Sequence, residues 1–241
     1  MTAERPVRGY DLYGRRRGRP LRQGRQRALE DLLPEVGIDL SGEGPLDPAA
    51  LFQKPPHDVW LEIGFGGGEH LAWQAANHPK VGLVGCEPFV NGVARLLSLV
   101  AERKLGNVRV LPDDARPLLD RLAPGSIGRA FILFPDPWPK ARHQRRRIVS
   151  EPVLDRLAAG MRAGAELRLA TDDMDYLRWM LERLLAHPAF EWMAEGPGDW
   201  RARPEDWPAT RYEQKALRQG RRPVYLRFRR RGASSARPEM T

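Results

Sequence analysis

The sequence predicts an α/β fold, a doubly wound sheet with helices on both of its faces. Apolar segments of strand length alternate along the chain with longer segments in which apolar residues repeat at helical spacing. Acidic residues follow the ends of successive strand segments, and ligands of doubly wound sheets bind outside those ends. Together these observations indicate one sheet with a ligand site at its carboxyl edge.

The expected elements follow one another in a regular order from residue 28 onward. After a short helix at 28–36 and a helical turn near 47–52, strands and helices alternate as far as residue 186. The segment between the last two strands is rich in Pro and Trp and is expected to be a loop. The expected strands are 59–63, 81–86, 108–111, 129–134, 166–171, 190–194 and 224–228. The expected helices are one that ends at residue 77 and those at 89–104, 117–122, 152–161 and 174–186.

Positive charge is concentrated at the two ends of the chain. The formal net charge of the 241 residues is +9, to which residues 1–28 contribute +7 and residues 215–241 contribute +8. Residues 29–214 are therefore acidic, at −6. Basic arms on an acidic body are typical of proteins that bind nucleic acid. We expect a flexible basic arm at 1–28, a short helix and linker at 29–56, one large domain at 57–230 and a disordered tail at 231–241.

Cysteine and histidine usage excludes several kinds of site. Cys86 is the single cysteine, so neither a disulfide framework nor a cysteine-rich metal site can form. The five histidines are scattered without the spacing of metal ligands, and we expect no metal. No run of 18 apolar residues exists, and the first residues lack the apolar segment of a secretory signal. These features favour a cytoplasmic protein without a membrane partner.

A glycine-rich turn follows the first expected strand, and its charge indicates which ligand it binds. Glu62 precedes Gly64 and Gly66, and the third glycine of the dinucleotide pattern G-x-G-x-x-G is missing. A carboxylate here would repel the pyrophosphate of a dinucleotide but attract the ammonium and sulfonium groups of S-adenosylmethionine. Glu87 follows at the distance expected of an acid that contacts ribose hydroxyls, and Asp114 would accept from the adenine amino group.

A proline-rich loop and a run of cations follow the fourth expected strand. Asp136 lies between two prolines in Phe134-Pro135-Asp136-Pro137-Trp138-Pro139, which predicts a stiff, extended segment. The residues that follow include four arginines between positions 142 and 147, and these suit a phosphate backbone. The alternative is a solvent-exposed charged loop without a ligand.

Four segments together resemble the bacterial tRNA (guanine-N7-)-methyltransferases, a family of class I S-adenosylmethionine-dependent enzymes. They are Leu61-Glu62-Ile63-Gly64-Phe65-Gly66, residues 134–143, Ala170-Thr171-Asp172 and Thr210-Arg211-Tyr212-Glu213. The resemblance covers roughly residues 10–230, and Pro139 departs from it because some members have His there. It implies a Rossmann-like, seven-stranded methyltransferase domain at 57–230. The implied reaction transfers a methyl group from S-adenosylmethionine to N7 of the variable-loop guanosine at position 46 of tRNA and leaves S-adenosylhomocysteine.

The resemblance also assigns roles position by position. Asp136 would be the catalytic residue and would contact the cofactor together with Glu62, Gly64, Gly66, Glu87 and Asp114. The substrate-binding residues would be Lys140, Asp172, Thr210, Arg211, Tyr212 and Glu213. The RNA-binding residues would be Arg142, His143, Arg145, Arg146 and Arg147.

Three other functions remain open at this point. A nicotinamide-dependent oxidoreductase would explain the fold but needs a different glycine-rich turn. A non-catalytic RNA-binding protein would explain the basic arms but not the acid-lined glycine turn. A methyltransferase that acts on an exocyclic amino nitrogen of RNA would share the cofactor site, although its usual Asn/Asp-Pro-Pro-Tyr/Phe loop differs from Pro-Asp-Pro-Trp. The sequence also leaves the choice between a monomer and a homodimer undecided.

Overall fold

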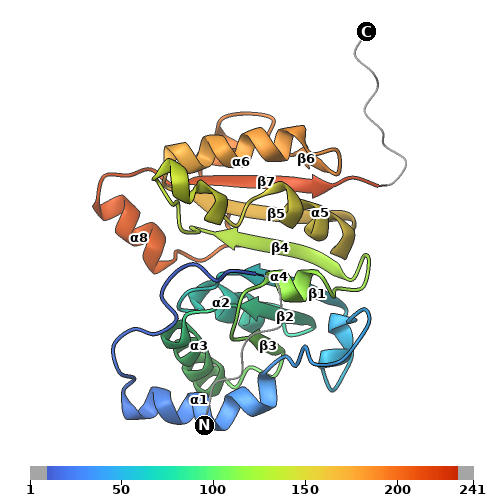
Figure 1. Cartoon of the computed structure of the whole chain (residues 1–241), viewed down its shortest axis with the longest axis vertical. Coiled ribbons are helices and arrows are strands. Elements are labelled where there is room, and N and C mark those ends of the chain that lie inside the picture. Colours follow the sequence, from blue (N-terminus) through green and yellow to red (C-terminus); the bar gives the residue numbers. More distant parts are fainter. Residues whose placement is uncertain (1–9, 233–241) are drawn as a thin grey trace.

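The computed structural model describes residues 10–232, and its strands form one mixed seven-stranded sheet (Figure 1). The strands are β1 (Asp58–Ile63), β2 (Val81–Cys86), β3 (Val108–Leu111), β4 (Ile127–Leu133), β5 (Met161–Thr171), β6 (Phe190–Trp192) and β7 (Val224–Arg230). Their order is β3-β2-β1-β4-β5-β7-β6, with β1 to β5 parallel and β7 antiparallel to both neighbours. The order reverses between β1 and β4, which makes this the switch point of a doubly wound sheet.

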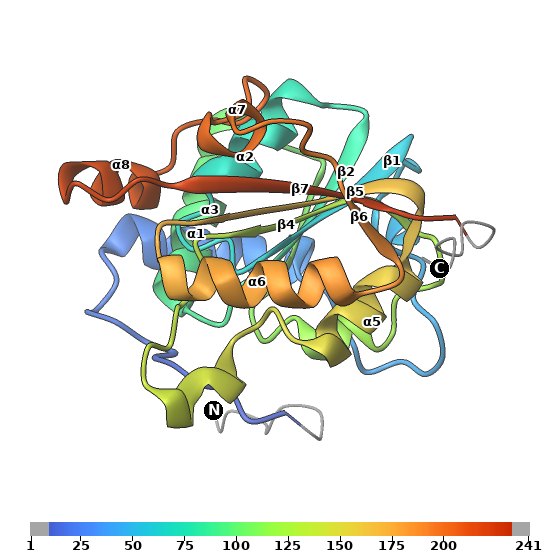
Figure 2. The same cartoon turned by 90° about the horizontal axis from the view of Figure 1, so that it is seen from above.

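Helices cover both faces of the sheet, as Figure 2 shows from above. One face packs against α1 (Gln23–Val36), α2 (Glu69–Asn77) and α3 (Val90–Arg103). The opposite face packs against α4 (Arg116–Leu119), α5 (Glu151–Gly160) and α6 (Met174–Ala186). The remaining helices are the 3₁₀ helices η1 (Pro48–Leu51) and η2 (Ala141–Arg146) and the α-helices α7 (Gly198–Arg201) and α8 (Arg211–Arg218).

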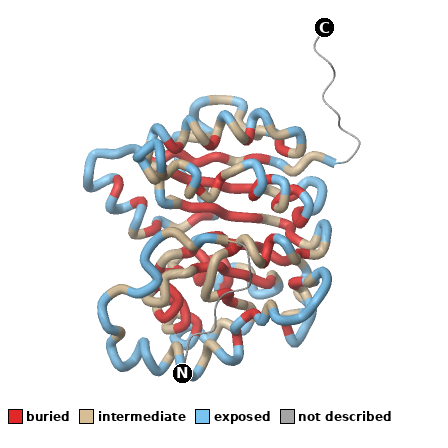
Figure 3. Tube along the Cα trace, in the orientation of Figure 1, coloured by how far each residue is buried: buried red, intermediate tan, exposed pale blue. Residues whose placement is uncertain are grey.

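The core follows the central strands, where buried residues are concentrated (Figure 3). Leu61 in β1 and Ile132 in β4 have no exposed surface, because helices remove both faces of these strands from water. Strands buried on both faces have nearly continuous apolar sequences. This burial explains why the strand segments could be recognised by composition.

The expected α/β sheet is confirmed, and each expected strand is present, although β5 begins at Met161 rather than at residue 166. Two expectations about helices were wrong. The segment between β6 and β7 contains α7 and α8 rather than only a loop, and α1 begins at Gln23 rather than at residue 28. α8 has only eight residues, most of them polar, so it is shorter than the window of about 11–18 residues over which a helical period is recognised. The signal that was available is the capping box of Thr210 and Glu213.

Residues 10–19 have no regular secondary structure, but they pack against the start of α3 and the loop after β3. The Asn91 side chain accepts a hydrogen bond from Gly18 N–H at 2.8 Å and donates to the Arg19 carbonyl at 2.7 Å. Arg16 forms an ion pair with Asp113 at 2.7 Å. This part of the expected flexible arm is therefore docked on the domain. Residues 1–9 of the arm and 233–241 of the expected tail lie outside the described residues.

We expect Leu61→Ala to lower the free energy of unfolding by about 2–5 kcal/mol, because the truncation leaves a cavity among fully buried residues. Leu217→Ala is the matched control, since Leu217 in α8 is 55% exposed and its loss should matter by less than about 0.5 kcal/mol. Urea-induced unfolding followed by circular dichroism measures both values. Equal losses in the two variants would contradict the position of Leu61 in the core.

Candidate active site

A cavity of about 390 Å³ lies at the carboxyl ends of β1, β2 and β4, where the strand order reverses. Its volume falls in the range of small-molecule sites. The lining comes from segments far apart in sequence, which meet only because parallel strands end at the same edge. Those segments are residues 12–15, 63–66, 86–89, 114–116, 133–138 and 145–153, with Tyr212 from α8.

The carboxylate of Glu87, just after β2, holds the glycine-rich turn (residues 64–68). Gly66 N–H donates to one oxygen of Glu87 at 2.7 Å, and Phe89 N–H donates to the other at 2.9 Å. Burial raises the pKa of Glu87, and these two donors oppose the rise by stabilising the ionised form. Each oxygen keeps a second lone pair, so Glu87 can still accept a hydrogen bond from a ligand in the cavity.

Two helices approach the glycine-rich turn so closely that Gly66 has no room for a side chain. A Cβ on Gly66, where φ is +58°, would lie 2.9 Å from Cε2 of Tyr212 in α8. A Cβ on Gly92 in α3 would lie 2.1 Å from the carbonyl oxygen of Gly66. Glycine at both positions therefore lets α3 and α8 contact the same turn.

The structure places the expected acidic residues differently from one another. Glu62 is only 2% exposed, does not line the cavity, and has Oε2 2.8 Å from Nδ1 of His70. Asp114 lines the cavity, where Arg116 donates to both of its carboxylate oxygens at 2.7–2.8 Å. The structure thus brings Gly64, Gly66, Glu87, Asp114 and Asp136 together at one cavity, and it leaves the carboxylate of Glu62 outside.

The Pro-Asp-Pro-Trp loop (residues 134–139) leaves β4 in a strained conformation. Phe134 and Trp138 have φ values of +51° and +45°, which bulky residues rarely adopt. Such strain costs about 1–3 kcal/mol per residue and persists where the surrounding structure fixes it, often at functional sites. Asp136 lies between these two residues, is exposed, lines the cavity, and has no hydrogen bond or ion pair with residues 10–232.

Arg147 holds the Pro-Asp-Pro-Trp loop in place from the protein interior. Its side chain is 1% exposed, donates to the Pro137 carbonyl at 2.8 Å and forms an ion pair with Asp175. Its guanidinium also lies over the rings of Tyr176 and Trp179, at 4.9 and 4.8 Å from their centroids. Arg147 therefore offers no exposed guanidinium to an RNA phosphate.

The other cations of the arginine segment (residues 141–147) are more accessible. Arg142 and Arg145 are exposed, and His143 is half-buried with its ring 6.0 Å from that of Trp138. The guanidinium of Arg146 lies between the rings of Tyr13 and Trp138, at 4.7 and 5.0 Å from their centroids. Positive charge is therefore available beside the cavity mouth.

Thr210 and Glu213 form the amino-terminal cap of α8. Glu213 N–H donates to the Thr210 hydroxyl oxygen at 3.2 Å, and Thr210 N–H donates to the Glu213 carboxylate at 3.4 Å. Glu213 also accepts from Tyr225 Oη at 2.7 Å and from Arg203 Nε at 3.0 Å. The buried carboxylate of Glu213 is thus already bonded to three protein groups.

The remaining expected substrate residues lie at the rim or outside the cavity. Tyr212 lines the cavity, and Arg211 lies 3.6 Å from Glu69 at the start of α2. Asp172 follows β5 and forms an ion pair with Arg221 at 2.7 Å. Lys140 is exposed at the beginning of η2 and does not line the cavity.

Residues 12–15 form part of the cavity wall, which was not predicted from the sequence. Two tyrosines in the basic arm were the available signal, because aromatic rings provide surfaces on which guanidinium groups pack. The structure shows such packing: Arg116 lies over the ring of Tyr10 at 4.6 Å, and Arg146 lies over the ring of Tyr13. Aromatic residues within an Arg-rich segment therefore indicated a docked segment rather than a free one.

Residues 10–232 contain neither a cluster of metal ligands nor a membrane-spanning helix. No group of three or more His, Cys, Asp or Glu side chains in this part of the chain could hold a metal ion. No helix in the same part is long and apolar enough to cross a membrane.

Comparison with known proteins agrees with the geometry. A family model described as "Putative methyltransferase" matches residues 56–226. A tRNA (guanine-N(7)-)-methyltransferase of Rhodospirillum rubrum is 53% identical over 231 residues, which cover 95% of this chain and 91% of that relative. Proteins of the same name from Ruegeria sp. and Brucella melitensis are 52% and 44% identical and cover 91% and 92% of this chain. The alignments cover 88% and 95% of those two relatives.

Solved structures show the same fold at low sequence identity. An rRNA methylase from Streptococcus thermophilus matches with a TM-score of 0.51 and 12% identity, over 77% of this chain and 92% of that chain. A 16S rRNA (adenine(1408)-N(1))-methyltransferase variant from Catenulisporales acidiphilia matches with a TM-score of 0.50 and 16% identity, over 79% and 94%. The expected Rossmann-like sheet is thereby confirmed.

We expect Arg147→Met to lower the free energy of unfolding by about 1–3 kcal/mol, because the Pro137 carbonyl loses its donor and Asp175 loses its partner. Arg142→Met, at an exposed position of the same segment, should change it by less than about 0.5 kcal/mol. Thermal and urea unfolding measure the difference. Wild-type stability in the Arg147 variant would mean that other contacts hold the loop.

Proposed function

The chain belongs to the tRNA (guanine-N7-)-methyltransferase family, and from this membership we propose which residues bind the cofactor, the guanine and the RNA. The protein is an S-adenosylmethionine-dependent enzyme that methylates N7 of guanine in tRNA. The main support for the residue assignment is Asp136, an exposed carboxylate without a protein partner between the glycine-rich turn and the arginine segment. We assign the target to the variable-loop guanosine at position 46, and the site of action to the cytoplasm.

The cavity residues fit S-adenosylmethionine, which supplies an electrophilic methyl group when it is bound. The fit rests on the side-chain-free surface at Gly64 and Gly66 and on the free lone pairs of Glu87, which suit ribose hydroxyls. The carboxylate of Asp114 suits the adenine amino group. Arginines as well as carboxylates line the cavity, and of the carboxylates Glu87 and Asp136 form no ion pair with residues 10–232, so these two suit the cationic groups of the ligand. We propose that Glu62 supports the glycine-rich turn from within the core.

Asp136 acts on the guanine through position and charge. The N7 lone pair lies in the plane of the ring and is unprotonated at neutral pH, so the reaction needs no general base. Because methylation makes the purine cationic, a carboxylate beside it stabilises the charge that develops in the transition state. The strained loop and Arg147 fix the backbone at Asp136 before substrate arrives, which suits catalysis by positioning.

Residues around the cavity mouth select and hold the base. We propose that Asp172 accepts hydrogen bonds from N1–H and the amino group of guanine, which adenine could not donate in the same pattern. Trp138 and Tyr212 provide flat surfaces for a base that has left its stack, since N7 faces a groove that side chains enter poorly. Thr210 and Glu213 support this side indirectly, because they cap α8 and so position Arg211 and Tyr212.

The accessible cations around the site hold the RNA backbone. We propose that Lys140, Arg142, His143, Arg145 and Arg146 contact phosphates together with arginines of the N-terminal segment. Arg147, whose guanidinium is buried, positions the catalytic loop instead. α8 projects beyond the edge of the sheet on the side to which β4 points, so the RNA-facing surface is broader than the cavity (Figure 1).

Nucleoside analysis of unmodified tRNA incubated with labelled S-adenosylmethionine tests both the function and the catalytic residue. The wild-type protein is expected to place the label in 7-methylguanosine. Asp136→Ala should lose at least about 10²-fold in single-turnover rate while tRNA affinity stays within about threefold, because an electrostatic contact made in the transition state is removed.

The other outcomes separate the alternatives. Label in a different nucleoside would overturn the assignment of N7, and tight tRNA binding without any label would favour a non-catalytic RNA-binding protein. Wild-type turnover by the Asp136 variant would overturn its catalytic role.

Salt dependence tests the RNA contacts. The affinity for tRNA should fall steeply as salt rises, because counterions are released from neutralised phosphates. Arg142→Ala combined with Arg145→Ala should reduce the slope of log affinity against log salt by about 1 to 2. Arg103→Ala is the control. Arg103 is exposed at the carboxyl-terminal end of α3, whereas the cavity lies near the amino-terminal end, so this variant should leave the slope unchanged. An unchanged slope in the double variant would exclude these residues from the RNA interface.

A further inference from the structure

A row of buried polar side chains lies beneath the glycine-rich turn, and the catalytic assignment does not use it. Glu62 in β1 and His70 and Gln74 in α2 are 2%, 2% and 0% exposed. Oε2 of Glu62 lies 2.8 Å from Nδ1 of His70, and Nε2 of His70 lies 3.1 Å from Nε2 of Gln74. Burial of polar groups costs free energy unless each has a partner. We call these three residues the polar row.

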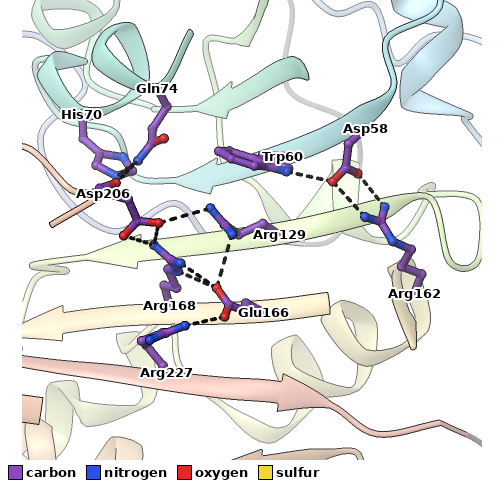
Figure 4. Close-up of polar contacts among 10 residues, drawn as sticks. All are labelled: Asp58, Trp60, His70, Gln74, Arg129, Arg162, Glu166, Arg168, Asp206 and Arg227. Carbon is purple, nitrogen blue, oxygen red and sulfur yellow. Dashed lines mark hydrogen bonds and ion pairs between the residues drawn. The ribbon is translucent and has the colours of Figure 1, made fainter. Parts of the chain in front are cut away.

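The partners of the polar row determine the direction of its hydrogen bonds. Nε2 of Gln74 also lies 3.0 Å from the carbonyl oxygen of Asp206, which can only accept (Figure 4). Gln74 therefore donates one hydrogen to Asp206 and the other to Nε2 of His70. His70 then has its proton on Nδ1 and donates it to Glu62. Rotation of the Gln74 amide would set its oxygen against the Asp206 carbonyl oxygen, so only this orientation makes both contacts of Nε2, and it leaves Oε1 of Gln74 buried without a partner among residues 10–232.

Gln74, the last residue of the polar row, contacts the Trp207 loop (residues 202–210). This loop follows α7, crosses the sheet and contains no helix or strand. Trp207 has no exposed surface, and its ring lies 5.7 Å from His70 and 5.5 Å from Tyr225. The carboxylate of Asp206 accepts from Arg168 at 2.9 Å, as Figure 4 shows. Because Arg168 is buried, loss of this partner would be costly. The Gln74 amide and the Arg168 guanidinium, both from buried residues, thus hold the loop at Asp206.

The Trp207 loop leads directly into α8, and its geometry sets the first turn of that helix. Arg203 donates from Nε to Glu213 at 3.0 Å and also donates to the Trp207 carbonyl, so one side chain ties the loop to the cap. The next two residues face the site. Arg211 lies 3.6 Å from the carboxylate of Glu69, and the ring of Tyr212 lies against Gly66. A displacement of the loop at Asp206 would therefore move the side chains that face the substrate.

We propose that His70 and Gln74 are positioning residues for tRNA methylation, which hold Tyr212 and Arg211 at the cavity through the Trp207 loop. The polar row starts at Glu62, two residues before the glycine-rich turn, so the turn and α8 are fixed to the same internal support. This inference rests on the proposed function, because it explains how the substrate side of that site is placed. It assigns a role to two buried residues that touch neither cofactor nor RNA.

Two substitutions of His70 each break a different contact of the polar row. H70N keeps an N–H close to the position of Nδ1 and lacks the acceptor at Nε2, so it retains the contact with Glu62 and releases Gln74. H70Q reaches the position of Nε2 and leaves Glu62 unpaired. The measurements are KM for tRNA, KM for S-adenosylmethionine, the melting temperature, and amide hydrogen exchange of residues 203–214.

The two variants should fail in different ways. H70N is expected to raise KM for tRNA at least about fivefold, to keep KM for S-adenosylmethionine within about twofold, and to accelerate exchange in residues 203–214. H70Q is expected to keep KM for tRNA within about twofold and to lower the melting temperature by at least about 3 °C, because a buried carboxylate has lost its partner. Asn77→Ala, which removes an exposed contact in the same helix, is the control and should change none of these values.

Equal changes in H70N and H70Q would overturn the proposal, since they would show that His70 acts only through packing. Faster exchange in H70N without a change in KM for tRNA would overturn it as well, because the loop would then have no influence on substrate. Unchanged exchange in H70N would show that the polar row does not hold the loop. Absence of 7-methylguanosine with the wild-type protein would instead reject the proposed function, and the exchange data would still decide whether the row holds the loop.

Discussion

The reversal of strand order between β1 and β4 is the constraint on which the site depends. The chain leaves β1 toward the face covered by α2 and leaves β4 toward the opposite face, which α5 covers. A crevice therefore opens where these two strands end. The glycine-rich turn follows β1 on one side of this crevice, and the Pro-Asp-Pro-Trp loop follows β4 on the other. Phe134 and Trp138 keep their unusual backbone angles because Arg147 and the sheet hold the loop at both ends. Strain and rigidity at Asp136 are therefore direct consequences of the topology.

Charge is distributed around the crevice so that each carboxylate has a different environment. Glu87 is bonded to backbone donors, Asp114 to Arg116, and Glu213 to the cap of α8, whereas Asp136 has no such partner among residues 10–232. A carboxylate that already has donors is oriented for a defined hydrogen bond, while one without donors can respond to charge that appears on a substrate. The difference in partners, rather than the number of acids, thus distinguishes binding residues from the catalytic candidate.

The sequence was sufficient for the sheet and for the location of the site, because buried strands such as Val81–Cys86 have continuous apolar runs and parallel strands end together. It was insufficient where the decisive contact joins residues far apart in the chain. Glu62 was expected in the cavity, but its carboxylate contacts His70, and His70 contacts Gln74, which donates to a loop more than 130 residues further along the chain. Arg147 appears in the sequence as one of several cations, and only the packing of Tyr176 and Trp179 removes it from solvent. α8 was missed because it has only eight residues, most of them polar, which is too short a segment for a helical period to be recognised.

The position of β7 has a consequence for the order in which the molecule can be completed during synthesis. β7 lies between β5 and β6, and β6 has no other strand neighbour in the sheet. Until residues 224–230 leave the ribosome, the edge of β5 stays open and β6 has nothing to pair with, so this half of the sheet is an unpaired and aggregation-prone edge. The Trp207 loop and α8 immediately precede β7, and Tyr225 within β7 supports Glu213 of the cap. A nascent chain would therefore complete its glycine-rich turn early and its substrate side last, which keeps an incomplete chain from presenting a finished RNA site.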